Sequence, residues 1–139
     1  IRFLKKLFID SDILLDIGLQ RPLFVLPAIN LMEYCYQTKL SAVTSAVAFV
    51  NVNYFFGKFA PATRLQSLSK LRSIVSIIQV NEQIIDLALS SNFNDFEDAV
   101  QYYSAISVGC DAIITRNLKD YKYSTIPVLT AEQFLRELL

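Results

Sequence analysis

Hydrophobic and polar residues follow two patterns along the chain: short continuous apolar runs, and longer stretches in which apolar residues recur at helical spacing. Short apolar runs are typical of buried strands, whereas the spaced pattern is typical of amphipathic helices. Strands are predicted at 6–9, 41–43, 74–80, 111–115 and 126–130. Short strands that alternate with helices predict an α/β fold, in which a mainly parallel sheet is covered by helices on both sides.

A few residues indicate where the helices begin and end. Gly18 is a plausible stop for a short helix that starts at Asp12. Pro22 suits the first turn of a second helix, which runs to about residue 39, although Pro27 allows a kink or a later start. A third helix is predicted from about residue 46 to 59, with Thr44 or Ser45 as its cap. Four more are predicted over 61–73, 82–90, 95–108 and 131–139. Asn81 is expected to cap the helix over 82–90, and Thr130 the helix over 131–139.

Polar residues gather at the carboxyl edge of the predicted sheet. Asp10 directly follows the first strand, and Asn117 and Asp120 follow the strand at 111–115. Asp98 lies at the start of a helix, whereas Asp111 precedes its strand and belongs to the opposite edge. Parallel sheets carry their functional sites outside the carboxyl ends of the strands, so Asp10, Asp98 and Asp120 are candidates for one site.

Ordinary structural roles can explain the acids at the helix starts. Asp is a favoured N-cap, so Asp10 could cap the helix that follows, although Asp12 or Ser11 could take that role instead. Asp95 and Asp98 have the spacing of a capping arrangement, and acids are favourable near the positive end of a helix. Taken alone, capping is the better account of Asp98.

The loop after the strand at 111–115 allows similar alternatives. Asn117 and Asp120 suit tight turns. Arg116 and Lys119 could be solvated charges, or a small basic rim that meets phosphate.

Composition narrows the chemistry. The chain has 139 residues, which predicts one domain over 1–139, and 13 basic residues balance 13 acidic ones, so no global basic field exists to hold nucleic acid. It contains no histidine, which excludes a histidine base, a Ser-His triad and ordinary zinc sites. Cys35 and Cys110 are interpreted as core thiols in a reducing cytosol.

A cytoplasmic protein without a membrane span is expected. The uncharged segment 41–57 is nearly long enough to span a bilayer, but polar residues interrupt it, which favours a buried element. The first residues lack the long apolar stretch of a secretory signal.

Several carboxylates that converge on one edge repel one another strongly. A hard divalent cation such as Mg²⁺ or Mn²⁺ offsets this repulsion, because it prefers carboxylate and water oxygens as ligands. Two such ions about 4 Å apart can activate water and stabilise the leaving oxygen of a phosphodiester.

The segments "FIDSDILLD", "DFEDAVQYYSAISVGCDAIITRN" and "LKDY" resemble a PIN-domain protein of the VapC toxin type, and the likeness extends over about 7–137. The resemblance implies a three-layer α/β/α domain with a parallel sheet of four to five strands. It also implies a metal-dependent endoribonuclease, often the toxin of a toxin–antitoxin pair and often a homodimer.

The resemblance places the first acid of the family at Asp10, its third at Asp98, and the end of the site at Asn117 and Asp120. It thereby implies Asp10, Asp98 and Asp120 as metal ligands. Thr115 and Ser11 could fix carboxylate rotamers, and Arg116 and Lys119 could contact RNA phosphate.

The chain departs from the family at one position. The family usually has a Glu in the helix after the second strand, and the best matching position here is Asn51. Asn keeps an oxygen but loses the charge, so Asn51, like Asn117, could coordinate the metal or orient water. Asp12, where the family often has Asn, is a candidate to compensate.

Three functions follow from these observations. The first is a Mg²⁺- or Mn²⁺-dependent endoribonuclease, and the second is a PIN-like module that lost catalysis through Asn51 and binds RNA or a partner protein. The third is a haloacid-dehalogenase-like phosphatase, because "FIDSDILL" fits an Asp-x-Asp motif with Asp10 as nucleophile and Asp12 as acid/base. Leu14, where that family usually has Thr or Val, and the lack of a later Asp-Asp pair after an apolar strand argue against the third.

Overall fold

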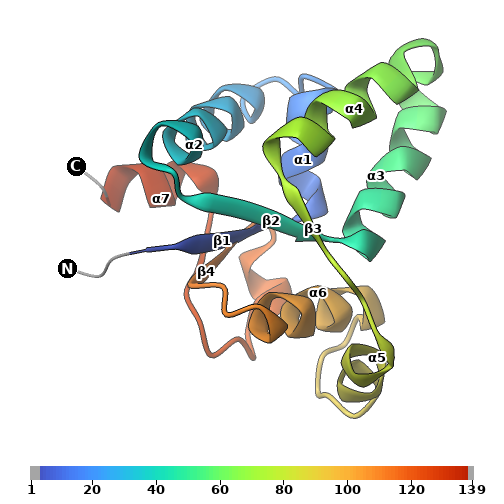
Figure 1. Cartoon of the computed structure of the whole chain (residues 1–139), viewed down its shortest axis with the longest axis vertical. Helices are drawn as coiled ribbons and strands as arrows, with labels where there is room; N and C mark the ends of the chain where they lie inside the picture. Colours follow the sequence, from blue (N-terminus) through green and yellow to red (C-terminus); the bar gives the residue numbers. More distant parts are fainter. Residues whose placement is uncertain (1–3, 138–139) are drawn as a thin grey trace.

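A parallel sheet of five strands forms the centre of the computed structural model, which describes residues 4–137 (Figure 1). The strands are β1 (Lys6–Ile9), β2 (Ser41–Ser45), β3 (Ser76–Ile78), β4 (Ala112–Ile114) and β5 (Val128–Leu129). Their order is β3-β2-β1-β4-β5, and every pairing is parallel. The predicted α/β class and parallel sheet are therefore confirmed.

Helices cover both faces of this sheet (Figure 1). One face carries α1 (Ser11–Gly18), α2 (Val25–Thr38), α3 (Ala46–Phe59), α4 (Arg64–Ile74) and α7 (Ala131–Glu137). The other face carries α5 (Glu82–Leu89) and α6 (Phe96–Ser107), and two short 3₁₀ helices, η1 (Pro61–Thr63) and η2 (Leu118–Tyr121), complete the order.

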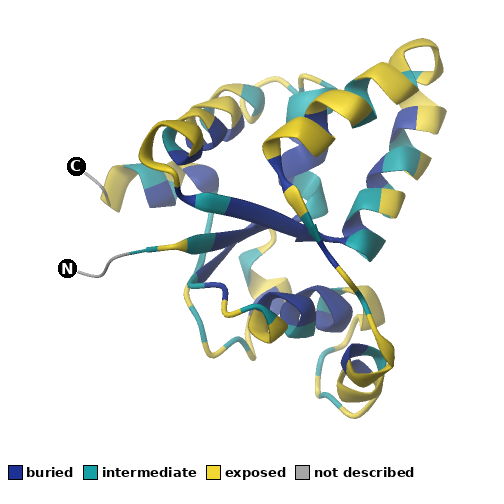
Figure 2. Cartoon of the chain, in the orientation of Figure 1, coloured by how far each residue is buried: buried dark blue, intermediate teal, exposed yellow. Residues whose placement is uncertain are grey.

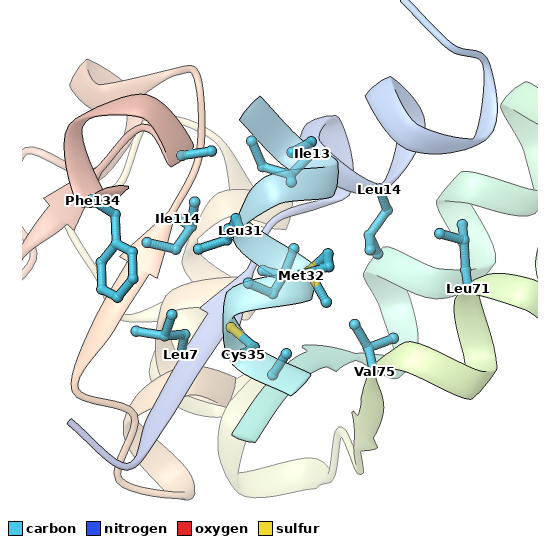
Figure 3. Close-up of a cluster of buried hydrophobic side chains, with 14 of the residues drawn as sticks. Leu7, Ile13, Leu14, Leu31, Met32, Cys35, Leu71, Val75, Ile114 and Phe134 are labelled. Atoms are coloured by element: carbon cyan, nitrogen blue, oxygen red, sulfur yellow. The ribbon is translucent and has the colours of Figure 1, made fainter. Parts of the chain in front are cut away.

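The alternation of side chains along β1 divides the core between the two faces. Leu7 and Ile9 pack with the larger helical layer, whereas Phe8 packs with α6 on the opposite face. Figure 3 shows the larger cluster, in which side chains from β1, β4, α1, α2, α4 and α7 meet. Figure 2 shows the same division, with buried strands at the centre and exposed residues on the outer sides of the helices. Because the sheet is buried on both faces, polar side chains can gather in the loops that follow the carboxyl ends of its strands.

Several boundaries differ from the predicted ones. Helix α2 begins at Val25, the later start that Pro27 allows, because the chain still turns at Leu23, whose φ is 74°. Pro27 lies in the first turn of α2, where its missing N–H would have had no intrahelical acceptor. Strand β3 is shorter than the predicted 74–80, because α4 continues through Ile74. The predicted end of the last helix, residues 138–139, lies outside the described residues.

The predicted caps are largely confirmed. Ser45, and not Thr44, caps α3 through a hydrogen bond from Ala48 N to its hydroxyl (3.0 Å). Asn81 caps α5 in the same way, by accepting from Ile84 N. Thr130 precedes α7 and accepts from Gln133 N, while the Gln133 side chain accepts from Thr130 N.

The uncharged segment 41–57 divides between β2 and α3. Within residues 4–137, no helix has both the length and the apolar character needed to cross a membrane. Cys35 and Cys110 are buried free thiols, as predicted, and burial raises their pKa values to about 11 and about 12, which keeps them in the unreactive thiol form.

Candidate metal centre

The order of the strands reverses direction at β1. From β1 the chain moves to β2 on one side, and β4 later pairs with β1 on the other. Asp10 follows β1, its backbone N–H donates to Ile114 O of β4 (3.0 Å), and Thr115 comes directly after β4. Ligands bind at such a switch point in open parallel sheets, so the topology itself places Asp10 and Thr115 at a candidate site.

Asp10 is the most tightly held acid of this site. Its side chain is only 7% exposed, Oδ1 accepts from Ser11 N (2.7 Å), and Oδ2 accepts from the hydroxyls of Thr115 and Tyr121 (2.9 Å each). Asp10 is itself the N-cap of α1, so the expectation that Asp12 or Ser11 could take that role instead is wrong. Burial, followed by the charge of Asp12, raises the pKa of Asp10 to about 7, although its hydrogen bonds oppose this shift.

Asp12 lies beside Asp10 and shares one of its donors. Its Oδ2 accepts from Arg116 N (2.8 Å), the Thr115 hydroxyl (3.2 Å) and Asn117 Nδ2 (3.4 Å). A hydroxyl has one hydrogen, so Thr115 can donate fully to only one of the two carboxylates at a time. The other oxygen, Oδ1, is buried and has no hydrogen-bond partner among the described residues. Burial is the main cause of the raised pKa of Asp12.

Asp98 and Asp120 both line a small hollow. Its volume is about 60 Å³, and it is lined by Phe93, Asn94, Asp95, Asp98, Lys119, Asp120, Lys122 and Tyr123. Asp95 caps α6 by accepting from Asp98 N (3.1 Å), which confirms the capping arrangement and leaves the Asp98 carboxylate outside it. The Asp98 side chain is therefore available to a ligand of the hollow.

The charges around Asp98 connect this hollow electrostatically to Asp10 at the end of β1. Burial is the largest cause that raises the pKa of Asp98 to about 7, and the carboxylates of Asp95, Asp10, Asp120 and Glu97 raise it further. Asp10 and Asp120, which are predicted to share a site with Asp98, therefore each lie within electrostatic reach of Asp98, although Asp10 is not part of the wall of the hollow.

Aromatic side chains hold the two walls of the hollow together. The Phe93 ring lies before α6 and packs against Tyr102 (5.2 Å between centroids), Tyr123 (5.9 Å) and Tyr121 of η2 (6.3 Å). Burial, together with the nearby charge of Asp10, raises the pKa of Tyr121 well above its usual value, so the phenol remains a hydrogen-bond donor to Asp10. Sequence reasoning missed this role of Tyr121, and its only signal was an aromatic residue directly after Asp120.

The remaining predicted residues make other contacts. Ser11 contacts Asp10 through its backbone N–H. Arg116 forms a two-point ion pair with buried Asp16 (2.8 and 3.0 Å) and lies over the Phe24 ring, which favours a structural role over the predicted phosphate contact. Lys119 remains exposed beside the hollow. Asn51 donates from Nδ2 to Oε2 of Glu97 (2.7 Å), a residue that sequence reasoning did not single out.

A divalent cation fits the chemistry of this donor set. Among residues 4–137, no three acidic or thiol side chains stand close enough to form a ready-made metal site. Mg²⁺ nevertheless keeps several waters and is commonly held by only one or two carboxylates. The unpartnered Oδ1 of Asp12 and the raised pKa values of Asp10 and Asp98 mark the acids that a bound cation would stabilise in their charged form.

Comparisons with known proteins agree with this geometry. The PIN-domain family model matches residues 6–119, and the chain belongs to the PIN-domain family. This membership argues against the dehalogenase-like phosphatase that the Asp-x-Asp pattern at residues 10 and 12 had suggested.

Individual proteins also match most of the chain. The chain is 27% identical to Ribonuclease VapC1 of Aquifex aeolicus (strain VF5) over 135 residues, which cover 94% of this chain and 93% of the relative. Among solved structures, VapBC2 from Rickettsia felis, bound to a DNA fragment from its promoter, matches with a TM-score of 0.69 and 14% identity, covering 89% of this chain and 96% of that one. A toxin–antitoxin complex from Klebsiella pneumoniae matches with a TM-score of 0.63 and 22% identity over the same shares. At these identities the structural matches establish the fold alone.

Proposed function

We propose that this protein is a divalent-metal-dependent endoribonuclease of the VapC type, which hydrolyses phosphodiester bonds in RNA as the toxin of a toxin–antitoxin pair. The observation that carries this proposal is the buried carboxylate of Asp10, which lies within electrostatic reach of Asp98 at the switch point of a PIN-domain sheet. The curated relative that spans nearly the whole chain is named a ribonuclease, which supports the same activity.

The proposed metal ligands are Asp10, Asp98 and Asp120, and the proposed cation is Mg²⁺ or Mn²⁺. When bound, such a cation supplies an activated water at neutral pH and stabilises the leaving oxygen of the phosphodiester. Thr115 and the backbone of Ser11 hold Asp10 in one orientation. Asn117, in the loop after β4, donates from its side-chain amide to Asp12.

Two lysines beside the hollow suit an RNA substrate. Lys119 and Lys122 line the hollow together with Asp95, Asp98 and Asp120, so the two lysines would contact a phosphate group there once a bound cation offsets the carboxylates. The chain has equal numbers of basic and acidic residues, so this local patch has to attract the RNA.

An antitoxin partner and a homodimer complete the proposal. Two of the structural neighbours are toxin and antitoxin proteins solved together, which supports an antitoxin for this chain. Exposed apolar residues on α2 support self-association. The proposed location is the cytoplasm, where RNA and a toxin–antitoxin pair would meet.

The alternative is a PIN-like module that binds RNA or protein without cleaving it. Asn51 favours this alternative, because the resemblance places an acid of the family at that position, and Asn carries no charge.

One assay separates the two functions. Purified protein is incubated with structured and single-stranded RNA in the presence of Mn²⁺ or EDTA, beside the double variant Asp10→Asn/Asp98→Asn. We expect cleavage that requires Mn²⁺ and is lost in the double variant. A matched control is Asp86→Asn, which removes an exposed acid of α5 and should cleave like the wild type. RNA binding without cleavage by the wild type supports the alternative, and cleavage that survives in the double variant contradicts the proposed site.

A further inference from the structure

The segment that carries Asp120 has little regular structure of its own. Asp120 lies in η2, a four-residue 3₁₀ helix that no side chain among residues 4–137 caps, and a loop over 122–127 follows before β5. Short 3₁₀ helices have poor hydrogen-bond geometry and are rarely extended further. The position of the Asp120 carboxylate therefore depends on the contacts that anchor this segment, residues 118–127, to the rest of the molecule.

The first anchor is the phenol of Tyr121. Tyr121 directly follows Asp120, is only 2% exposed, and donates from its hydroxyl to Oδ2 of Asp10 at 2.9 Å. This hydrogen bond joins η2 to the end of β1 across 111 positions of sequence. Hydrogen bonds to an ionised carboxylate are stronger than those between neutral groups, so this contact restrains the backbone next to Asp120 relative to Asp10.

The second anchor is the phenol of Tyr102, on α6. Tyr102 lies four residues after Asp98, so both side chains are on the same face of that helix. Its hydroxyl is 2.9 Å from Oγ1 of Thr125, and Thr125 N donates to it at 3.2 Å. The buried ring also packs against Phe93, which contacts Tyr121 as well. Tyr102 therefore fixes the far end of the segment to the helix that carries Asp98.

We propose that Tyr121 and Tyr102 are positioning residues of the candidate metal centre. Their hydroxyls hold the segment that carries Asp120, so that its carboxylate stands at a fixed place relative to Asp10 and Asp98. This inference rests on the proposed function, and neither tyrosine binds the cation itself. Phenylalanine would fill the same space in the core but has no hydroxyl, so the anchoring is a property of the phenol oxygen.

Metal titration tests the role of each hydroxyl without knowledge of the RNA. Mn²⁺ is titrated by calorimetry into the wild type, Tyr121→Phe, Tyr102→Phe and Tyr36→Phe. We expect Tyr121→Phe to weaken Mn²⁺ binding by about 10-fold or more, because it removes a hydrogen bond to a proposed metal ligand. Tyr102→Phe should weaken binding by a smaller factor, because it acts only through the segment. Tyr36→Phe is the matched control, since this tyrosine of α2 is 87% exposed, and it should bind Mn²⁺ like the wild type.

Hydrogen exchange in EDTA tests the anchoring without a cation. Backbone amides over 118–127 should exchange faster in Tyr121→Phe and in Tyr102→Phe, whereas those of α3 should exchange as in the wild type, as measured by mass spectrometry. A tyrosine that only stabilises the fold would instead lower the melting temperature and leave the Mn²⁺ affinity unchanged. Circular dichroism verifies that each variant is folded.

The two measurements separate this inference from the proposed function. Wild-type Mn²⁺ affinity in Tyr121→Phe and Tyr102→Phe, with binding lost in Asp98→Asn, overturns the positioning role and leaves the proposed function standing. Unchanged exchange over 118–127 in both tyrosine variants also overturns the positioning role. A wild type that binds no Mn²⁺ overturns the proposed function, and this inference with it.

Discussion

At the scale of the residue, the site is a group of carboxylates that folding has placed in an unfavourable environment. Asp10 is buried among donors, one of which, Thr115, is shared with Asp12, and the charges of four other acids act on Asp98. Each hydrogen bond from Thr115 or Tyr121 stabilises the charged form of Asp10, but burial outweighs them. Without a cation, the folded protein is therefore least stable when Asp10 and Asp98 are both ionised.

The raised pKa values predict how stability depends on pH. Folding raises the pKa of Asp10 and of Asp98 from 3.8 to about 7, so the folded state binds protons more tightly than the unfolded state. The contribution of these groups is most favourable at low pH and is lost as the pH rises through about 7. We expect the melting temperature in EDTA to fall between pH 5 and pH 8, and Mn²⁺ to raise it more at pH 8 than at pH 5.

Asp10→Asn provides the control for this prediction. The variant lacks one of the two raised groups, so its melting temperature should change less over the same pH range. Thermal unfolding followed by circular dichroism is the measurement. A wild-type melting temperature in EDTA that does not fall from pH 5 to pH 8 would contradict the electrostatic description of the site.

At the scale of the element, the end of α1 approaches α3 closely. Gly18 ends α1, and a Cβ at this position would lie 2.1 Å from Cζ of Phe56, a fully buried ring on α3. Because such a contact forces side chains or backbone to move, we expect Gly18→Ala to lower the free energy of unfolding by about 1–3 kcal/mol. Denaturation in urea measures the loss.

Gly57→Ala is the matched control for Gly18→Ala. Gly57 lies inside α3, and the nearest atom to an added Cβ is Cδ of Arg64 at an ordinary 3.5 Å. Alanine favours the helix over glycine, so this variant should be up to about 1 kcal/mol more stable than the wild type. Equal stability of the two variants would show that the approach of α1 to α3 tolerates a methyl group.

At the scale of the whole molecule, one side of α2 belongs to the core and another is apolar but exposed. Leu31 and Cys35 are buried, whereas Leu26 and Ile29 are 65% and 43% exposed, and Leu23 just before the helix is 89% exposed. Figure 2 shows exposed residues along the outer side of α2. Grouped apolar residues on a surface are typical of an interface.

We therefore expect a homodimer that uses this side of α2. The double variant Leu26→Lys/Ile29→Lys should be monomeric and folded, as measured by analytical ultracentrifugation and circular dichroism. Leu65→Lys, at an exposed apolar position of α4, is a control that should leave the oligomeric state unchanged. A monomeric wild type at micromolar concentration would reject this expectation.

The class of fold and most of the elements could be predicted from local patterns in the sequence, as could the acids proposed for the candidate site. Periodicity and caps such as Asn81 and Thr130 are local signals, and the position of Asp10 after β1 follows from the order of elements. Local signals could not decide whether Asp10 or Asp12 caps α1, because both are acids at the same helix start. Only the tertiary structure brought Tyr121 to Asp10, Arg116 to Asp16 and Glu97 to Asn51, because these contacts join segments 46 to 111 positions apart and depend on how helices pack on the sheet.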